Sequence, residues 1–255
     1  MEQEGKYIYC IIGTKQDRDF GPIGIGGRGD KVSTIGADDL AMVISSHPLT
    51  KLVVNRENIL AHEKVIEEVM KEYAVLPVRF CTIASSADEI RSLLFKRYRE
   101  FKNLLRDMDH KVELGVKGLW KDMDSIFKEI AEEDKEIKKI KRRLKKNAEQ
   151  KDIEAKVGLG KLVEAALKNK KDGEAEKIVD MLKASAFDYK LSNTAGDEMF
   201  INASFLVSKG REKEFDNIME ELGEAYKDRM KFLYVGPLPP YNFVNVTIYQ
   251  EEWEK

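Results

Sequence analysis

Cysteine is scarce in this chain, and no long apolar run occurs in it. The 255 residues include only two cysteines, Cys10 and Cys81, too few for the disulfide framework of a small secreted domain. The longest apolar run covers residues 7–12, whereas a membrane-spanning helix needs about 20 residues. The acidic start Met1-Glu2-Gln3-Glu4 lacks the basic region and cleavage site of a signal peptide. We therefore expect a cytoplasmic protein without a membrane span.

The chain also lacks a large net charge. Its 44 Lys and Arg residues stand against 46 Asp and Glu residues, which gives a net charge of −2. Such a chain has no global positive field to attract a polyanion, so nucleic acid is not expected as the main partner. Hydrophobic residues make up 42% of the sequence and charged residues 35%. This composition and length fit a charged globular protein with one large or two modest cores.

Residue sets that carry out catalysis or bind metals are missing too. The three histidines, His47, His62 and His110, do not have metal-ligand spacing, and no Ser/His/Asp set, nucleophile elbow or P-loop occurs. The G-x-G-x-x-G at residues 24–29 precedes a strand pattern instead of a helix, which favours a glycine hairpin over a dinucleotide site. We predict no catalytic residue, no cofactor and no metal, and hence no enzyme. His62 is interpreted as a packing residue, with an acid/base role as the alternative.

Apolar periodicity predicts an α+β domain over residues 1–110. Strands are expected at residues 6–12, 31–35, 40–45 and 77–83, and helices at residues 55–73 and from Ser86 to about Met108. Asn55 is a candidate N-cap of the first helix, and Ser86 with Glu89 fits a capping box for the second. The order β-β-β-α-β-α is typical of an α+β arrangement.

The second half, residues 111–255, has the order β-α-β-β-α-β of a ferredoxin-like domain with an oversized first crossover. Strands are predicted at residues 111–120, 187–191, 199–207, 231–235 and 243–249, with a helix at residues 211–228. The crossover is a charged helical insertion at about residues 123–183, with interruptions expected near residues 158–160 and 172–173. Its basic stretch, Lys138–Lys146, is interpreted as part of a solvated helical hairpin, with docking on an acidic partner as the alternative.

Three of the six prolines lie in the segment Gly236–Val244 (GPLPPYNFV), between the last two predicted strands. Proline fixes φ and has no N–H for a sheet, so the segment is expected to be a rigid, kinked connector. Tyr241 and Phe243 are predicted to anchor it to the core or to the first domain. A polyproline ligand is the alternative, because Pro237–Pro240 fits P-x-x-P.

Four motifs, in order along the sequence, carry a family resemblance. They are Leu76–Thr82 (LPVRFCT), Val112–Lys117 (VELGVK) followed by Trp120, Asn202–Val207 (NASFLV) and Gly236–Val244. Together they resemble the gas vesicle protein F/L (GvpF/GvpL) family over nearly the full chain. One position departs from the family pattern: Cys81 stands where the family usually has glycine.

The resemblance implies two domains, the second a modified ferredoxin-like one, and an accessory or minor structural role in gas vesicle assembly. It further implies localisation at the gas vesicle and binding to the hydrophobic shell protein and to other accessory proteins. The candidate partner-binding residues are those of the motifs: Pro77, Arg79, Phe80, Gly236, Pro237, Pro239, Pro240, Tyr241 and Phe243. Arg79 is expected to make a charge-assisted contact with a carboxylate, such as that of Glu113, or with backbone carbonyls near the seam between the domains, and so to fix their relative orientation. A ferredoxin-like ligand-binding regulator or an enzyme of unknown substrate is the alternative, because that fold hosts many functions.

Overall fold

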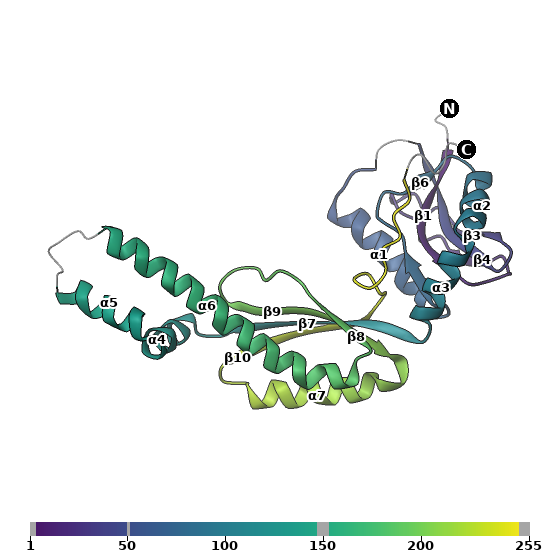
Figure 1. Cartoon of the computed structure of the whole chain (residues 1–255). Helices are drawn as coiled ribbons and strands as arrows, with labels where there is room; N and C mark the ends of the chain where they lie inside the picture. Colours follow the sequence, from purple (N-terminus) through teal and green to yellow (C-terminus); the bar gives the residue numbers. More distant parts are fainter. Residues whose placement is uncertain (1–3, 50–51, 147–152, 250–255) are drawn as a thin grey trace. The chain divides into compact units, whose positions relative to one another are not determined.

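The computed structural model describes residues 4–49, 52–146 and 153–249, and it divides the chain into two compact units (Figure 1). The first unit contains the residues up to Glu113 together with those from Pro237 onward, and the second is Leu114–Gly236. The sequence prediction assigned residues 237–255 to the second domain. In the structure this segment belongs to the first unit, because Tyr241 packs against that unit's core and Val246 bridges to Val78.

An antiparallel sheet forms the centre of the first unit. Its strands are β1 (Glu4–Ile12), β2 (Asp19–Gly21), β3 (Val32–Ala37), β4 (Leu40–Pro48), β5 (Val75–Pro77) and β6 (Ile83–Ala84). The strand order is β2-β3-β4-β1-β5, and β6 also pairs with β1. Every side chain from Tyr7 to Ile12 in β1 is fully buried. This central strand is covered on both faces, which is why its sequence reads as a continuous apolar run and not as an alternation.

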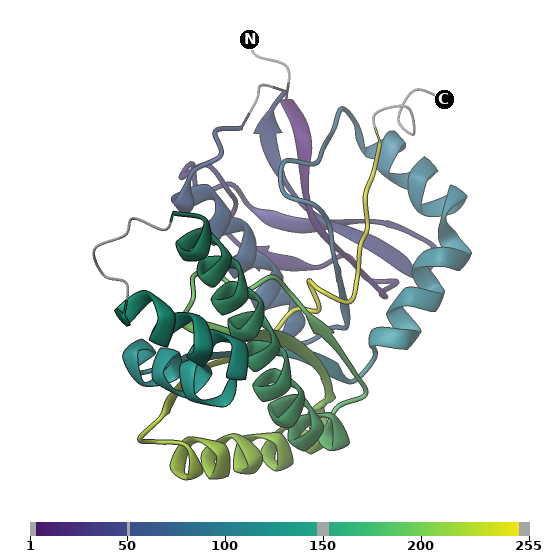
Figure 2. The ribbon, with the colours of Figure 1, turned by 60° about the vertical axis from the view of Figure 1, so that its left-hand side comes forward.

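Helices cover both faces of this sheet, with α1 (Arg56–Met70) on one side and α2 (Ala87–Lys96) and α3 (Tyr98–Met108) on the other (Figures 1 and 2). The predicted caps are confirmed: the Asn55 side chain accepts a hydrogen bond from the Asn58 N–H at 2.8 Å, and Ser86 accepts one from the Glu89 N–H at 3.2 Å. The Glu89 carboxylate reaches back to the Ser85 N–H, one residue earlier than in a standard capping box.

Three predicted elements of the first unit differ in the structure. The strand expected at residues 77–83 is two short strands, because the chain turns at Cys81, whose φ is +68°. The helix expected from Ser86 to Met108 is broken at Arg97, where φ and ψ leave the helical range. The strand expected at residues 243–249 is an extended segment with a single bridge, since residues 239–244 form turns that direct the chain elsewhere.

The second unit has the predicted β-α-β-β-α-β order. Its elements are β7 (Lys111–Trp120), α4 (Met123–Glu133), α5 (Lys135–Lys146), α6 (Ile153–Leu182), β8 (Asp188–Leu191), β9 (Met199–Ser208), α7 (Glu212–Ala225) and β10 (Met230–Leu238). The sheet order is β10-β7-β9-β8, so the first and third strands of the unit are central, as in ferredoxin-like folds. The fold class is therefore α+β, with a ferredoxin-like order in the second half.

The crossover from β7 to β8 is helical but is not interrupted where the sequence suggested. Helix α6 continues through Gly158, Gly160 and Gly173, and a Cβ at any of these positions would meet no atom within 4 Å. Glycine costs only about 1 kcal/mol in a helix interior, and the buried stripe of α6 offsets that cost. This stripe consists of Leu167, Ala175, Ile178, Val179 and Leu182. Within the described part of the crossover a break lies at Asp134, whose carboxylate accepts the first free N–H groups of α5.

A half-buried ion cluster connects the helices of the crossover to the sheet. The Arg229 guanidinium binds the carboxylates of Glu129 in α4 and Glu174 in α6, and Glu174 also accepts the Trp120 indole N–H. The hydrogen bonds from Arg229, together with the nearby Lys170, lower the pKa of Glu129 to about 2. Trp120 in turn stacks on Phe200, so the cluster fixes the packing of α4 and α6 against β7 and β9.

Candidate functional site

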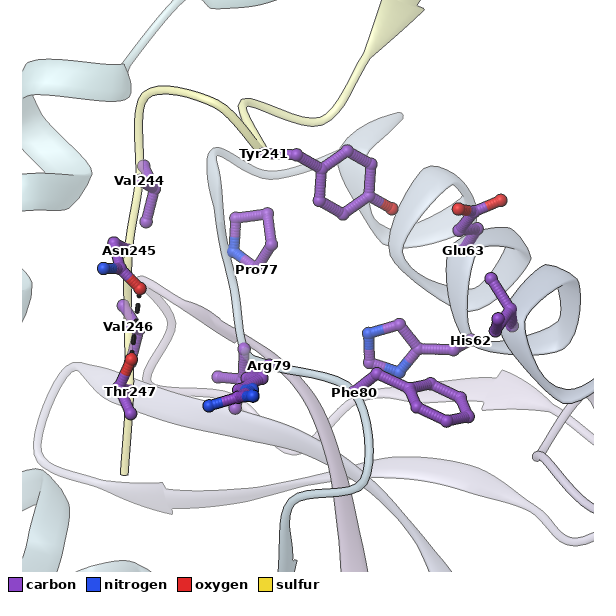
Figure 3. A pocket seen from close by; sticks show the side chains of 12 residues that line it. His62, Glu63, Pro77, Arg79, Phe80, Tyr241, Val244, Asn245, Val246 and Thr247 are labelled. Atoms are coloured by element: carbon purple, nitrogen blue, oxygen red, sulfur yellow. Dashed lines mark hydrogen bonds between the residues drawn. The ribbon is translucent and has the colours of Figure 1, made fainter. Parts of the chain in front are cut away.

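The first unit contains a groove of about 500 Å³ whose walls come from three separate segments (Figure 3). Helix α1 contributes Ile59, His62 and Glu63, and the chain after β5 contributes the segment from Pro77 to Phe80. The third wall is the C-terminal segment, with Tyr241 and the residues from Val244 to Thr247. The groove therefore joins one motif from the first third of the sequence with another from its end.

Four of the nine predicted site residues line this groove: Pro77, Arg79, Phe80 and Tyr241. The others, Gly236, Pro237, Pro239, Pro240 and Phe243, do not. Pro239 and Pro240 are buried, and the Pro240 carbonyl accepts hydrogen bonds from the N–H groups of Phe243 and Val244. Gly236 has a φ of +144°, which L side chains rarely adopt. The proline segment thus shapes the turn that delivers Tyr241 and Val244 to the groove.

His62 lies at the base of the groove and is buried. Its Nδ1 is 2.9 Å from the Tyr7 hydroxyl, which also accepts the Cys81 N–H at 3.3 Å. Because the Tyr7 oxygen already accepts from the backbone, its own hydrogen is available for Nδ1. Burial lowers the pKa of His62 to about 4. The ring is therefore neutral near pH 7 and packs against Tyr9 and Phe80, which fits the predicted packing role.

A layer of buried aromatic and polar side chains supports this base. Tyr7 and Tyr9 contact each other edge to face, with ring centroids 4.9 Å apart. The Tyr9 hydroxyl is 2.8 Å from the Ser45 hydroxyl and accepts the Ile25 N–H at 2.8 Å. Each of the two tyrosine hydroxyls thus has hydrogen-bond partners of its own, so this layer forms a rigid base for the groove.

The prediction that Arg79 binds a carboxylate such as Glu113 is wrong. The side chain of Arg79 is exposed and has no hydrogen-bond or ion-pair partner in the part of the chain that the structure describes. Glu113 is buried, and its two carboxyl oxygens accept the backbone N–H and the side-chain amide of Asn242, at 2.8 and 2.5 Å. Arg79 lines the groove instead.

The groove also contains a carboxyl group that sequence reasoning missed, that of Glu63. Burial raises the pKa of Glu63, and burial likewise raises the pKa of Tyr241, whose hydroxyl has no hydrogen-bond partner among the described residues. In Figure 3 the Tyr241 hydroxyl points toward Glu63. Helical spacing could have placed Glu63 beside Ile59 on one face of α1, since residues four apart are neighbours. No sequence signal placed residues 244–247 beside β5.

We predict that Cys81→Gly stabilises the protein by up to about 1 kcal/mol. Cys81 has a φ of +68°, a conformation in which a Cβ atom lies too close to the backbone. Glycine has no Cβ and adopts this conformation without strain. Chemical denaturation measures the change. Cys81→Ser, which keeps a Cβ at this position, is the control and should not stabilise. A destabilised glycine variant would show that the thiol contributes packing that outweighs the backbone strain.

In the described part of the chain, no helix has both the length and the apolar character needed to cross a bilayer. Within the same ranges, His, Cys, Asp and Glu side chains do not gather in groups of three or more that could hold a metal ion.

Comparison with known proteins identifies the family of the chain. The model of the family described as "Gas vesicle synthesis protein GvpL/GvpF" matches residues 5–245. The chain belongs to the GvpL/GvpF family. The resemblance inferred from the four motifs is thereby confirmed, and with it a place among the structural and assembly proteins of gas vesicles.

Members of the GvpL/GvpF family from distant organisms align with nearly the whole chain. Gas vesicle protein F of a Streptomyces species is 30% identical over 241 residues, covering 93% of this chain and 98% of the relative. Gas vesicle protein F1 of Halobacterium salinarum is 26% identical over 252 residues, covering 98% and 97%. The crystal structure of GvpF from an Anabaena species has a TM-score of 0.82 at 22% identity, covering 96% and 100%, and shows the same fold.

Proposed function

We propose that this protein serves gas vesicle assembly as a binding protein, without catalysis. It holds the hydrophobic shell protein, contacts other assembly proteins, and works in the cytoplasm where vesicles grow. The observation that carries this proposal is the groove: the two family motifs at 76–82 and 236–244 contribute residues to one concave surface of the first unit. A ligand-binding or enzymatic role is less well supported, because His62 is neutral, buried and committed to packing.

The proposed task is to cover apolar surface before it reaches the vesicle wall. A shell subunit rich in apolar side chains would aggregate if that surface stayed exposed to water. A folded protein can prevent this by offering a complementary apolar surface, and each Å² of apolar area removed from water contributes about 25 cal/mol. Such a partner needs an apolar surface that is open in the free protein.

The groove and its rim provide such a surface. Ile59, which is 38% exposed, and the half-buried Phe80 give the groove an open apolar lining, whereas Val244 and Val246 line it as buried side chains. Further apolar side chains are exposed just before α1 and in α1 itself: Val53 is 67% exposed, Val54 72% and Leu60 51%. Several large apolar residues left in water on one short segment are typical of an interaction site. We therefore assign the shell-binding surface to the groove and the start of α1.

Co-purification with the shell protein tests this assignment. Ile59→Asp with Leu60→Asp is expected to reduce the captured shell protein at least tenfold, because two carboxylates would be desolvated in the contact. Both positions are partly exposed and lie near the helix N-terminus, where acidic residues are tolerated. Phe95→Asp is the matched control: Phe95 is 77% exposed in α2 and does not line the groove, so capture should persist.

The salt dependence provides a second readout of the same experiment. Apolar association should survive at about 0.5 M salt, where the Debye length falls to about 4 Å and exposed charge pairs are screened. Loss of all binding at high salt would contradict an apolar contact. Loss caused by neutralising Lys141, Arg142 and Arg143 alone would move the contact to the helical crossover.

A further inference from the structure

Helix α5 carries a concentration of positive charge that the rest of the chain does not share. Its 12 residues include eight Lys or Arg and a single acidic residue, Glu136. Residues 135–171 contain 14 Lys and Arg against 5 Asp and Glu, a net charge of +9, whereas the whole chain has −2. All other residues together therefore carry −11. The net charge of −2 is therefore the sum of a strongly basic stretch, residues 135–171, and an acidic remainder.

The basic residues of α5 face outward. Ile137 is buried, and Ile140 and Leu144 are half-buried on the stripe that packs against the neighbouring helices. Lys135, Lys138, Lys139, Lys141 and Arg142 are all exposed. At 100° per residue, Lys135, Lys138, Lys139 and Arg142 lie on the face opposite Ile137. Figure 1 shows α5 and the first turns of α6 projecting past the ends of the strands.

Within the described part of the chain, the positive charges on this face of α5 are not neutralised by neighbouring carboxylates, as they are on other helices. Elsewhere, basic residues pair with carboxylates three positions away, as in Lys71–Glu68, Arg91–Asp88 and Lys183–Asp180. No described residue forms an ion pair with the five exposed residues of α5: Lys135, Lys138, Lys139, Lys141 and Arg142. Like charges at i,i+4, such as Lys135 with Lys139 and Lys138 with Arg142, oppose helix formation. A bound anion would relieve this repulsion.

We propose that the exposed face of α5 binds a carboxylate-rich helical surface of a partner protein. A carboxylate-bearing helix matches it, because residues four apart on both helices have the same spacing. Nucleic acid is disfavoured because the −11 on the remaining residues repels a long polyanion. The face of α5 has no aromatic residue on which a base could stack. Its apolar residues point inward, which leaves none for insertion into a lipid surface.

A labelled peptide of about 20 residues with repeating Glu-Ala-Ala-Ala units tests the proposal, since it places a carboxylate every fourth residue. The full-length protein is titrated at low salt and binding is followed by fluorescence anisotropy. In the test variant, Lys138, Lys139, Lys141 and Arg142 are changed to Gln. The matched control changes four exposed lysines outside α5 to Gln: Lys117, Lys177, Lys213 and Lys231. Circular dichroism confirms that both variants keep their helix content.

The α5 variant is expected to bind the peptide at least about tenfold more weakly, because four exposed charge pairs are lost, while the control changes less than about twofold. Equal weakening in both variants would mean that only net charge matters and would overturn the proposal. A single-stranded oligonucleotide, or vesicles containing phosphatidylglycerol, binding more tightly than the peptide through the same four residues would overturn it as well. The shell protein takes no part, so either result leaves the groove assignment untouched.

Discussion

Replacing Tyr241 with alanine is expected to lower the free energy of unfolding of the first unit by about 3 kcal/mol. Tyr241 packs against the buried cluster that contains Tyr9, Val65 and Val69, although it lies in the last 15 residues of the chain. Its removal would leave a cavity in this cluster and detach the C-terminal wall of the groove. Urea unfolding, followed by hydrogen exchange of the backbone amides of β1, measures the loss of unfolding free energy.

Two companion variants separate the causes of this loss. The Tyr241 hydroxyl is buried without a hydrogen-bond partner among the described residues, so Tyr241→Phe should be neutral or slightly stabilising. Phe243, the second predicted anchor, is half-buried like Tyr241 but is not among the side chains that pack against this cluster, so Phe243→Ala should cost less than Tyr241→Ala. If Tyr241→Phe were as damaging as Tyr241→Ala, the hydroxyl and not the ring would be the anchor, and the packing argument would fail.

Replacing Asn242 with alanine is expected to cost about 2 kcal/mol of stability through Glu113. Glu113 is 2% exposed, and the Asn242 side-chain amide donates to one of its carboxyl oxygens. Without that donor a buried carboxyl oxygen has no partner, and an unsatisfied buried polar group costs about 1–3 kcal/mol. The backbone N–H of Asn242 still serves the second oxygen, which limits the loss.

A double-mutant cycle with Glu113→Gln checks this mechanism, because the two single losses should add to more than the loss in the double variant. Asn245→Ala is the control for a nearby exposed asparagine, and we expect a change within about 0.5 kcal/mol. Equal destabilisation by Asn242→Ala and Asn245→Ala would show that the Glu113 contact contributes nothing specific.

Local sequence patterns placed most elements because they depend on neighbours in the chain. The Asn55 and Ser86 caps act within one turn, and the apolar run of β1 reports a strand covered on both faces. The same reasoning failed at Cys81 and Arg97, where the backbone leaves regular geometry. It also failed in α6, where glycine suggested breaks but the helix is continuous and carries a buried stripe.

The candidate site was predictable only in part. Pro77, Arg79, Phe80 and Tyr241 were found as members of motifs, not as neighbours in space. The partner of Arg79 was predicted wrongly because a short strand with arginine after Pro77 does not show which neighbour the side chain faces, and the carboxylate of Glu113 accepts hydrogen bonds from Asn242 instead.

By itself, the sequence determined the α+β class, the family and the charge separation between α5 and the remaining chain, since these follow from residue types and local periodicity. Only the tertiary structure decided that the last segment joins the first unit and closes a groove beside His62 and Arg79. The physical reason is that the contacts of Tyr241 and Val246 are made with residues far away in the chain. Apolar burial is non-directional, so the sequence shows that these residues need a core but not which core they join.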